Sequence, residues 1–181
     1  MNQGLIPNRY AKALYEYAAE SGSDKRVFDL MQKLADAFVA EPDLAKAVSN
    51  PFVSRRDKIQ LLATASGADA DDKVMERFMT LLADNNRLDM ARDIALAYLK
   101  MYRTKHNIRL VTVTSAVPMA AADEDRLKEM IQRHLGSAKM EYRHLIDANL
   151  IGGFVVSIDN EKLDASVANE LKQLRLKLLS K

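Results

Sequence analysis

The sequence predicts a mostly α-helical fold: an N-terminal six-helix bundle followed by a small α/β domain of order β-α-β-β-α. Apolar residues recur at helical spacing through roughly the first hundred of the 181 residues. From Ile108 the pattern changes to β-branched and alternating runs. Alanine and leucine are abundant whereas there are only six glycines and four prolines, which favours helices with short connections. The change of pattern predicts two domains, residues 1–105 and 106–181.

Each of the first three helices is predicted from an apolar face and from residues that start or stop helices. The first ends at Ser21-Gly22, and its apolar face consists of Tyr10, Ala13, Leu14, Tyr17 and Ala18. The second starts at Asp24 as N-cap, and its apolar face consists of Val27, Leu30, Met31, Leu34 and Phe38. Pro42 opens the third, which must end near Asn50 because a residue before proline disfavours the helical conformation.

Three further helices complete the predicted bundle. Ser54 followed by Asp57 resembles a capping box with Asp in place of Glu, and that helix ends at Ser66-Gly67. Asp71 and Asp72 precede a fifth helix, KVMERFMTLLADNN, and a sixth covers Leu88 to Lys105. The fifth helix has a wide apolar arc: Val74, Met75, Phe78, Met79, Leu81 and Leu82. This arc suits either a central, well-buried helix or, together with the first helix, a groove for a partner helix.

The second half alternates strands and helices. Strands are expected at residues 108–117, 138–147 and 150–158, with helices at 123–136 and 164–179. Leu127, Met130, Ile131 and Leu135 are expected to face inward. The last helix combines apolar with basic residues: Val167, Leu171, Leu174, Leu178, Lys172, Arg175 and Lys177. Cations near a helix C-terminus normally interact with the helix dipole, and a basic docking surface is the alternative.

The stretch LIGGFVVSIDN, Leu150 to Asn160, has paired glycines beside an apolar run, as some phosphate-binding loops do. A phosphate loop needs its glycines after a strand and directly before a helix, so that backbone N–H groups face the anion. Here Gly152 and Gly153 come before or at the start of the strand-like run. The order therefore favours a tight strand entry, where glycine permits close backbone approach.

No pattern in the sequence predicts catalysis, a cofactor or a metal. There is no cysteine, and the three histidines, His106, His134 and His144, have no second ligand at metal-binding spacing. No Gly-x-Ser-x-Gly or Gly-x-Gly-x-x-Gly motif occurs, so a small-molecule enzyme is disfavoured. The formal charge is +2 with both signs mixed along the chain, whereas a nucleic-acid-binding adaptor, the alternative function, needs a concentrated basic face.

The sequence also predicts a protein that does not insert into a membrane. No apolar run approaches the roughly 20 residues that span a bilayer. The N-terminal MNQGLIPNRYAKAL lacks the layout of a secretory signal, so a cytoplasmic location is expected.

Three separated segments resemble one protein family. They are RYAKALYEYA at Arg9–Ala18, FMTLLADNNRLDMARDIALAYLKMY in the middle, and DANLIGGFVVSIDNEKLDASVANELKQL near the end. In this order they resemble the δ subunits of F-type ATP synthases, whose mitochondrial counterpart is the oligomycin-sensitivity-conferring protein. The resemblance extends over essentially the whole chain.

The resemblance implies a non-catalytic stator subunit, present once in the complex and peripheral at the cytoplasmic face of the bacterial plasma membrane. It implies that the first domain binds the N-terminal helix of an α subunit in a groove between its first and fifth helices. The matching positions are Tyr10, Ala13, Leu14, Tyr17, Phe78, Leu81, Leu82 and Asn85. It implies that the second domain binds the b subunits of the peripheral stalk. The candidate positions there are Gly153, Phe154, Val167, Leu171, Leu174 and Leu178.

Overall fold

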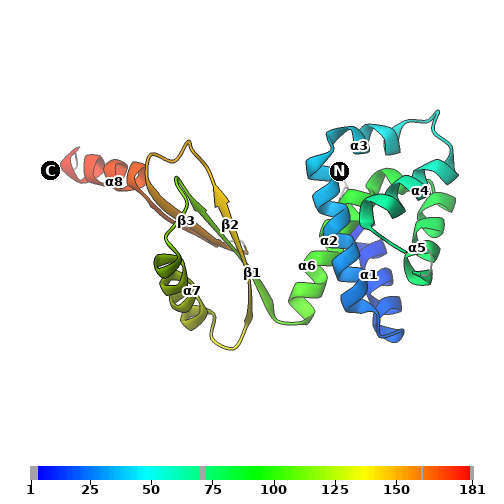
Figure 1. Cartoon of the computed structure of the whole chain (residues 1–181), viewed down its shortest axis with the longest axis horizontal. Helices are drawn as coiled ribbons and strands as arrows, with labels where there is room; N and C mark the ends of the chain where they lie inside the picture. Colours follow the sequence, from blue (N-terminus) through cyan, green and yellow to red (C-terminus); the bar gives the residue numbers. More distant parts are fainter. Residues whose placement is uncertain (1–3, 70–71, 160, 180–181) are drawn as a thin grey trace. The chain divides into compact units, whose positions relative to one another are not determined.

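The computed structural model describes residues 4–69, 72–159 and 161–179 (Figure 1). The chain divides into two compact units, Met1–Tyr102 and Arg103–Lys181. The first unit is helical, and the second contains a four-stranded sheet with two helices. The predicted fold class, a helical N-terminal region followed by a small α/β domain, is therefore confirmed. In the part of the chain that is described, no helix combines the length and apolarity that crossing a bilayer requires.

Six α-helices form the first unit, the last of which continues three residues into the second. They are α1 Leu5–Glu20, α2 Asp24–Ala40, α3 Pro42–Ser49, α4 Arg55–Ser66, α5 Lys73–Asp84 and α6 Ala91–Lys105. A 3₁₀ turn, Leu88–Met90, precedes α6, where the sequence predicted one continuous helix.

The helix ends follow the local chemistry that the sequence indicated, with one difference. The Ser54 hydroxyl accepts the backbone N–H of Asp57 at 3.2 Å, which is the expected N-cap, and it donates to the Asp57 carboxylate at 2.7 Å, where a capping box would use the Ser54 backbone N–H. Gly67 ends α4 in the left-handed conformation, with φ of 65°. The N-cap of α2 is Ser23 and not Asp24, which is the first helical residue. Asp71 lies outside the described residues, and Asp72 is the N-cap of α5.

The bundle core is assembled from one face of each helix and is anchored by aromatic residues of α6. Tyr98 is fully buried, and its hydroxyl donates to the Asp24 carbonyl at 3.0 Å, so the buried polar group is satisfied. Burial raises the pKa of Tyr98, so the phenol stays neutral in the core. The rings of Phe28 and Tyr102 stack with centroids 4.4 Å apart. The core therefore fixes α6 against α2.

The second unit contains a mixed sheet of strand order β2-β1-β3-β4. The strands are β1 Ile108–Ser115, β2 Lys139–Ile146, β3 Gly153–Ile158 and β4 Glu161–Ser166, and the helices are α7 Ala121–Leu135 and α8 Val167–Leu179. β1 pairs with β2 in parallel, through the α7 crossover, and with β3 antiparallel. β3 and β4 form an antiparallel hairpin in which Ile158 pairs with Glu161.

Three predictions for this unit were incomplete or wrong. β4 was not predicted, because EKLDAS contains only one large apolar residue, Leu163, and shows no strand-like alternation. The last helix begins at Val167 rather than at Asp164, which lies in β4. Met130 was expected to face inward but is exposed.

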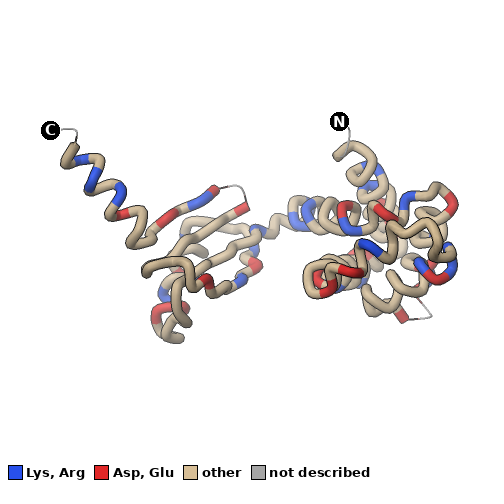
Figure 2. Tube along the Cα trace, turned by 90° about the horizontal axis from the view of Figure 1, so that it is seen from above, with Lys and Arg blue, Asp and Glu red and all other residues tan. Residues whose placement is uncertain are grey.

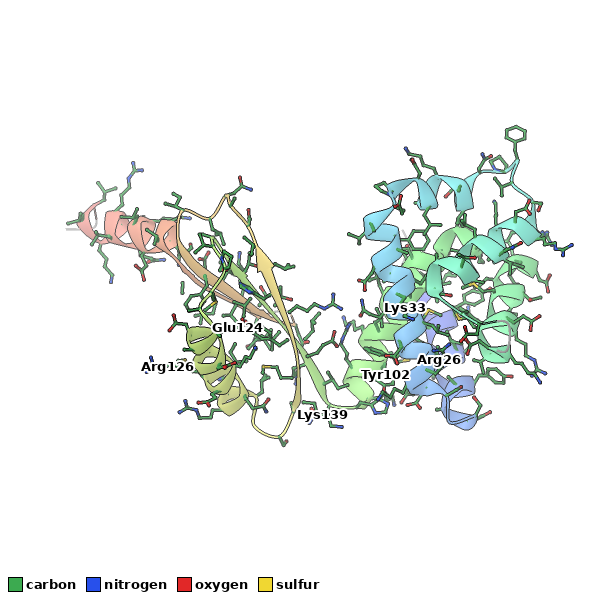
Figure 3. The ribbon with its side chains drawn as sticks, in the orientation of Figure 1. Arg26, Lys33, Tyr102, Glu124, Arg126 and Lys139 are labelled. Atoms are coloured by element: carbon green, nitrogen blue, oxygen red, sulfur yellow. The ribbon has the colours of Figure 1, made fainter. Side chains whose placement is uncertain are left out.

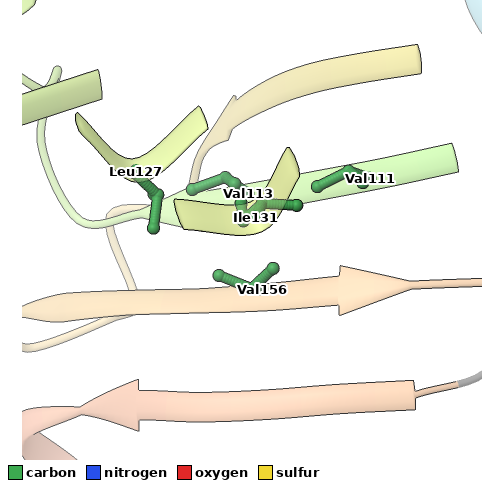
Figure 4. Packing of buried hydrophobic residues seen from close by; sticks show 5 residues of the cluster. All are labelled: Val111, Val113, Leu127, Ile131 and Val156. Carbon is green, nitrogen blue, oxygen red and sulfur yellow. The ribbon is translucent and has the colours of Figure 1, made fainter. Parts of the chain in front are cut away.

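A small apolar core joins α7 to the sheet (Figure 4). Val111 and Val113 of β1, Val156 of β3, and Leu127 and Ile131 of α7 are all buried in it. The valines alternate along β1 and so share one face, and the two α7 residues are one turn apart. The two-residue spacing of the strand and the four-residue spacing of the helix thus place apolar side chains at the same interface.

A bidentate ion pair lies within the second unit. The guanidinium of Arg103 donates to both carboxylate oxygens of Glu141 on β2, at 2.7 and 2.8 Å. Burial alone would raise the pKa of Glu141, but the hydrogen bonds and charge of Arg103, together with Arg143, outweigh it and lower the pKa. The paired geometry therefore favours the ionised carboxylate in the folded state.

We expect Glu141→Gln to lower the free energy of unfolding by about 1–3 kcal/mol at pH 7, because Arg103 loses a charged partner. The pKa of Glu141 is lowered in the folded state. The contribution of its carboxylate to the free energy of unfolding is therefore complete above the unfolded pKa of about 4.3, and it is lost as the pH falls through the folded-state pKa. Urea denaturation followed by circular dichroism between pH 7 and pH 3 measures this. The difference from wild type should shrink in acid. Asp159→Asn, which breaks the exposed Arg109–Asp159 pair, is the control and should change stability by less than about 0.5 kcal/mol.

Candidate partner-binding surfaces

The structure brings α1 and α5 into contact, and the side chains predicted for the first partner site divide between core and surface. Leu14, Phe78 and Leu82 are buried, with Leu14 only 2% exposed. These three cannot contact a partner directly and instead hold the two helices together. The other five positions are exposed or half-buried: Tyr10, Ala13, Tyr17, Leu81 and Asn85.

A contact that the sequence did not reveal links the two helices at the surface. The Arg77 guanidinium of α5 donates to the Tyr17 hydroxyl of α1 at 2.7 Å, although the residues are 60 positions apart. Arg77 lies four residues before Leu81, and Asn85 four residues after it, so all three follow one line of α5. We call Tyr10, Ala13, Tyr17, Arg77, Leu81 and Asn85 the α1–α5 face. Of this line, helical spacing predicted Leu81 and the family resemblance added Asn85, whereas no local signal indicates the contact of Arg77.

The connection leading into α5 is held by charged groups. Arg26 of α2 donates to Asp69 at 2.7 Å and to Asp72 at 2.9 Å (Figure 3 labels Arg26). The hydrogen bond from Arg26 lowers the pKa of Asp72, so the contact favours the charged carboxylate. Because Asp72 is also the N-cap of α5, this pair fixes the start of the helix that forms one side of the α1–α5 face.

The second surface is α8, which buries none of its side chains. Val167, Leu171, Leu174 and Leu178 are all exposed and are spaced by four, three and four residues. This spacing produces a narrow apolar stripe along one side of a helix, as in a coiled-coil seam. Figure 2 shows basic residues along α8, whose first turn also contains Glu170, whereas both signs are mixed elsewhere in each unit. We call these four residues the α8 stripe.

Gly153 and Phe154, predicted with the α8 stripe, have a different environment. Phe154 is half-buried and packs against the α7–sheet core. Gly153 pairs with Ser166 at the start of the β3–β4 hairpin and has a φ of 76°. The structure therefore places these two residues at the base of α8 and not on its exposed stripe.

An open apolar pocket lies beside α7. It has a volume of about 430 Å³ and is formed by α7, β3 and β4. Leu127, Met130, Ile131, Val156, Ile158 and Leu163 supply its apolar lining, and His134, Glu161 and Lys162 its polar lining. It exists because α7 covers β1 and β3 but leaves Leu163 on the edge strand exposed. This explains why Met130 is exposed: it borders this pocket.

Two polar clusters of the second unit, around Ser115 and Glu124, are held by hydrogen bonds and ion pairs and contain no activated nucleophile. The buried Ser115 hydroxyl donates to the Val117 carbonyl at 2.6 Å and lies 2.7 Å from His144 Nε2. Since the hydroxyl has one hydrogen, Nε2 must donate to Ser115, which is the reverse of a serine activated by a histidine base. Glu124 pairs with Lys128 at 2.8 Å, and this hydrogen bond lowers the pKa of Glu124. Within the described residues no group of three possible metal ligands occurs.

The amino-acid sequence matches a known family along nearly its whole length. The family model for the ATP synthase delta (OSCP) subunit matches residues 6–178. The chain belongs to the ATP synthase delta (OSCP) subunit family. The family resemblance inferred from the three sequence segments is confirmed.

Two bacterial members of the delta (OSCP) family align with this chain over nearly their full lengths. "ATP synthase subunit delta" of Parabacteroides distasonis is 36% identical, covering 99% of this chain and 98% of the relative. The protein of the same name from Bacteroides thetaiotaomicron is 34% identical, covering 100% and 97%. A chain in the cryo-EM structure of the Toxoplasma gondii mitochondrial ATP synthase hexamer has a TM-score of 0.72 at 22% identity, covering 96% of this chain and 97% of that chain. This last likeness shows a shared fold.

We predict that Leu14→Asp unfolds the bundle or lowers its stability by at least about 4 kcal/mol, because it places a charge in the core. Leu81→Asp should cost less than about 1 kcal/mol, since Leu81 is 45% exposed. Urea denaturation of the full chain, followed by circular dichroism, measures both. Equal losses for the two variants would show that Leu81 is not a surface residue.

Proposed function

We propose that this protein is a non-catalytic stator subunit of an F-type ATP synthase, linking the α3β3 catalytic head to the peripheral stalk of b subunits. In this role it resists the torque that would otherwise turn the head with the rotor during proton-driven ATP synthesis. The observation that carries the proposal is the match to the delta (OSCP) family over residues 6–178. The protein would be present once per complex, peripheral, at the cytoplasmic face of the bacterial plasma membrane.

The α1–α5 face suits an amphipathic helix, and we assign to it the N-terminal helix of an α subunit. Leu81 and Tyr17 offer exposed apolar area, and Ala13 between Tyr10 and Tyr17 lets a partner backbone approach closely. Arg77 and Asn85 supply polar groups at its border. Burial of apolar surface at roughly 25 cal/mol per Å² would drive docking.

We assign the α8 stripe to the helical b subunits. A seam of four apolar residues at coiled-coil spacing fits a partner that is itself a long helix. Binding through residues 1–105 to the head and through residues 106–181 to the stalk makes the link bivalent, so neither contact has to provide all the affinity. Outside α8 both signs of charge are mixed in each unit, which offers no support for the nucleic-acid alternative, because that function requires an extended basic face and salt-sensitive binding.

We expect Leu81→Asp to weaken binding of a peptide with the α-subunit N-terminal sequence at least about tenfold, because an apolar contact becomes a desolvated charge. Isothermal titration calorimetry with the full-length protein measures the affinity. Leu96→Asp is the matched control, since Leu96 on α6 is 48% exposed and lies outside the α1–α5 face. Wild-type affinity in Leu81→Asp would contradict the assignment.

For the stalk we expect Leu174→Asp to weaken binding of a soluble b-subunit segment at least about tenfold. Leu176→Asp should leave it within about threefold, because Leu176 lies on the other side of the helix with nearly the same exposure, 53% against 55%. Leu163→Asp tests whether the partner binds the pocket beside α7 instead of the α8 stripe, because Leu163 lines that pocket and lies outside the stripe. Loss of binding only in Leu163→Asp would move the stalk site to that pocket.

A further inference from the structure

Helix α8 is unusual because none of its side chains is buried. It follows β4 with no intervening residue, since β4 ends at Ser166 and α8 starts at Val167 (Figure 1). It has 13 residues, none of them buried. Isolated helices shorter than about 12–15 residues are marginal in water. The contacts at the base of α8 must therefore keep the helix formed and set its direction.

The first half of this base comes from the paired glycines. A Cβ atom at Gly153 would lie 2.3 Å from the Ala165 carbonyl oxygen, so only glycine lets β3 start this close to the end of β4. The φ of 76° at Gly153 also favours glycine. The Gly152 carbonyl accepts the backbone N–H of Val167 at 3.1 Å. The glycines thus connect the first residue of α8 to the opposite strand.

The second half is a reciprocal cap. The Asp164 carboxylate accepts the Ser166 N–H at 3.0 Å, and the Ser166 hydroxyl accepts the Asn169 N–H at 3.2 Å. The Asn169 side-chain amide then donates back to the Asp164 carbonyl at 2.9 Å. Ser166 is buried, so water does not compete for its hydroxyl. Ser166 is therefore the N-cap of α8, and Asn169, in the third helical position, both donates its backbone N–H to this cap and links back to β4.

We propose that Gly152, Gly153, Asp164, Ser166 and Asn169 form a clasp that positions α8, holding its first turn formed and its direction fixed in the free subunit. The clasp presents the α8 stripe already ordered, which lowers the entropy lost when a helical partner binds. These residues act through α8 and touch no partner themselves. The effect on stalk binding depends on the function proposed above, whereas the effect on α8 itself does not.

Ser166→Ala and Ser166→Thr test the clasp in the full-length protein. Ser166→Ala removes the cap, so we expect amide hydrogen exchange at residues 167–171 to become at least about fivefold faster while α7 and β1 exchange as in wild type. Affinity for a soluble b-subunit segment should fall about three- to tenfold. Ser166→Thr keeps the hydroxyl oxygen and should show wild-type exchange at residues 167–171 and wild-type affinity. Ser157→Ala in β3 is the control and should change neither.

A second pair of variants tests the contact of Gly152 with α8, with amide hydrogen exchange as the only measurement. A Cβ at Gly152 would lie 3.2 Å from Val167 Cγ2. Gly152→Ala should therefore speed exchange in the first turn of α8, and Gly152→Ala combined with Val167→Ala should reverse most of that change.

The outcomes separate the clasp from the stator role. Unchanged α8 exchange in Ser166→Ala would overturn the clasp, whatever the affinity. Faster exchange with unchanged affinity would overturn its positioning role in binding. If the wild-type protein failed to bind the b-subunit segment, the stator assignment would fail, and the exchange measurements would still decide whether the clasp orders α8.

Discussion

The first unit depends on one constraint: six short helices can bury their apolar faces only against one another. Each helix buries its most apolar side chains in the shared core. Side chains on the adjoining part of the helix remain at the surface. On α1 this puts Leu14 inside and Tyr17 outside; on α5 it puts Leu82 inside and Leu81 outside. The exposed side chains of α1 and α5 are thus aligned by the same packing that buries their neighbours. A partner helix would meet a surface that the core has already ordered, which keeps the cost of binding low.

The second unit meets the same requirement less completely. Its sheet is covered by α7 over β1 and β3, where five residues form the core, but the edge strand β4 has no helix over Leu163. α8 could have covered that edge, yet its direction is fixed at its first residue by the Gly152 carbonyl and by the Ser166 cap. Apolar area is consequently left on both α8 and β4. A domain this small gains stability by burying such area, so its exposure supports the partner surface proposed for α8.

The helices and the change to strands could be predicted because they depend on local periodicity and on local capping residues such as Ser54 and Gly67. β4 could not, because EKLDAS forms a strand only through its pairing with β3 and the close approach at Gly153, both of which are non-local. The same limit applies to the candidate site. Periodicity identified the apolar faces of α1 and α5 but could not separate buried Leu14 from exposed Tyr17, and it gave no sign of the Arg77 contact across 60 residues.

The paired glycines show why residue order outweighs residue type in assigning chemistry. A phosphate loop and this clasp use the same property, a backbone that can be approached closely because Cβ is absent. In a phosphate loop the free N–H groups of the following helix face the anion. Here two of the first three N–H groups of α8 already have acceptors, Val167 with the Gly152 carbonyl and Asn169 with the Ser166 hydroxyl. An anion would have to displace both bonds and would meet the Asp164 carboxylate, whose pKa the Ser166 hydrogen bonds lower. The glycines therefore serve the position of a helix, and it is the helix that offers a surface to a partner.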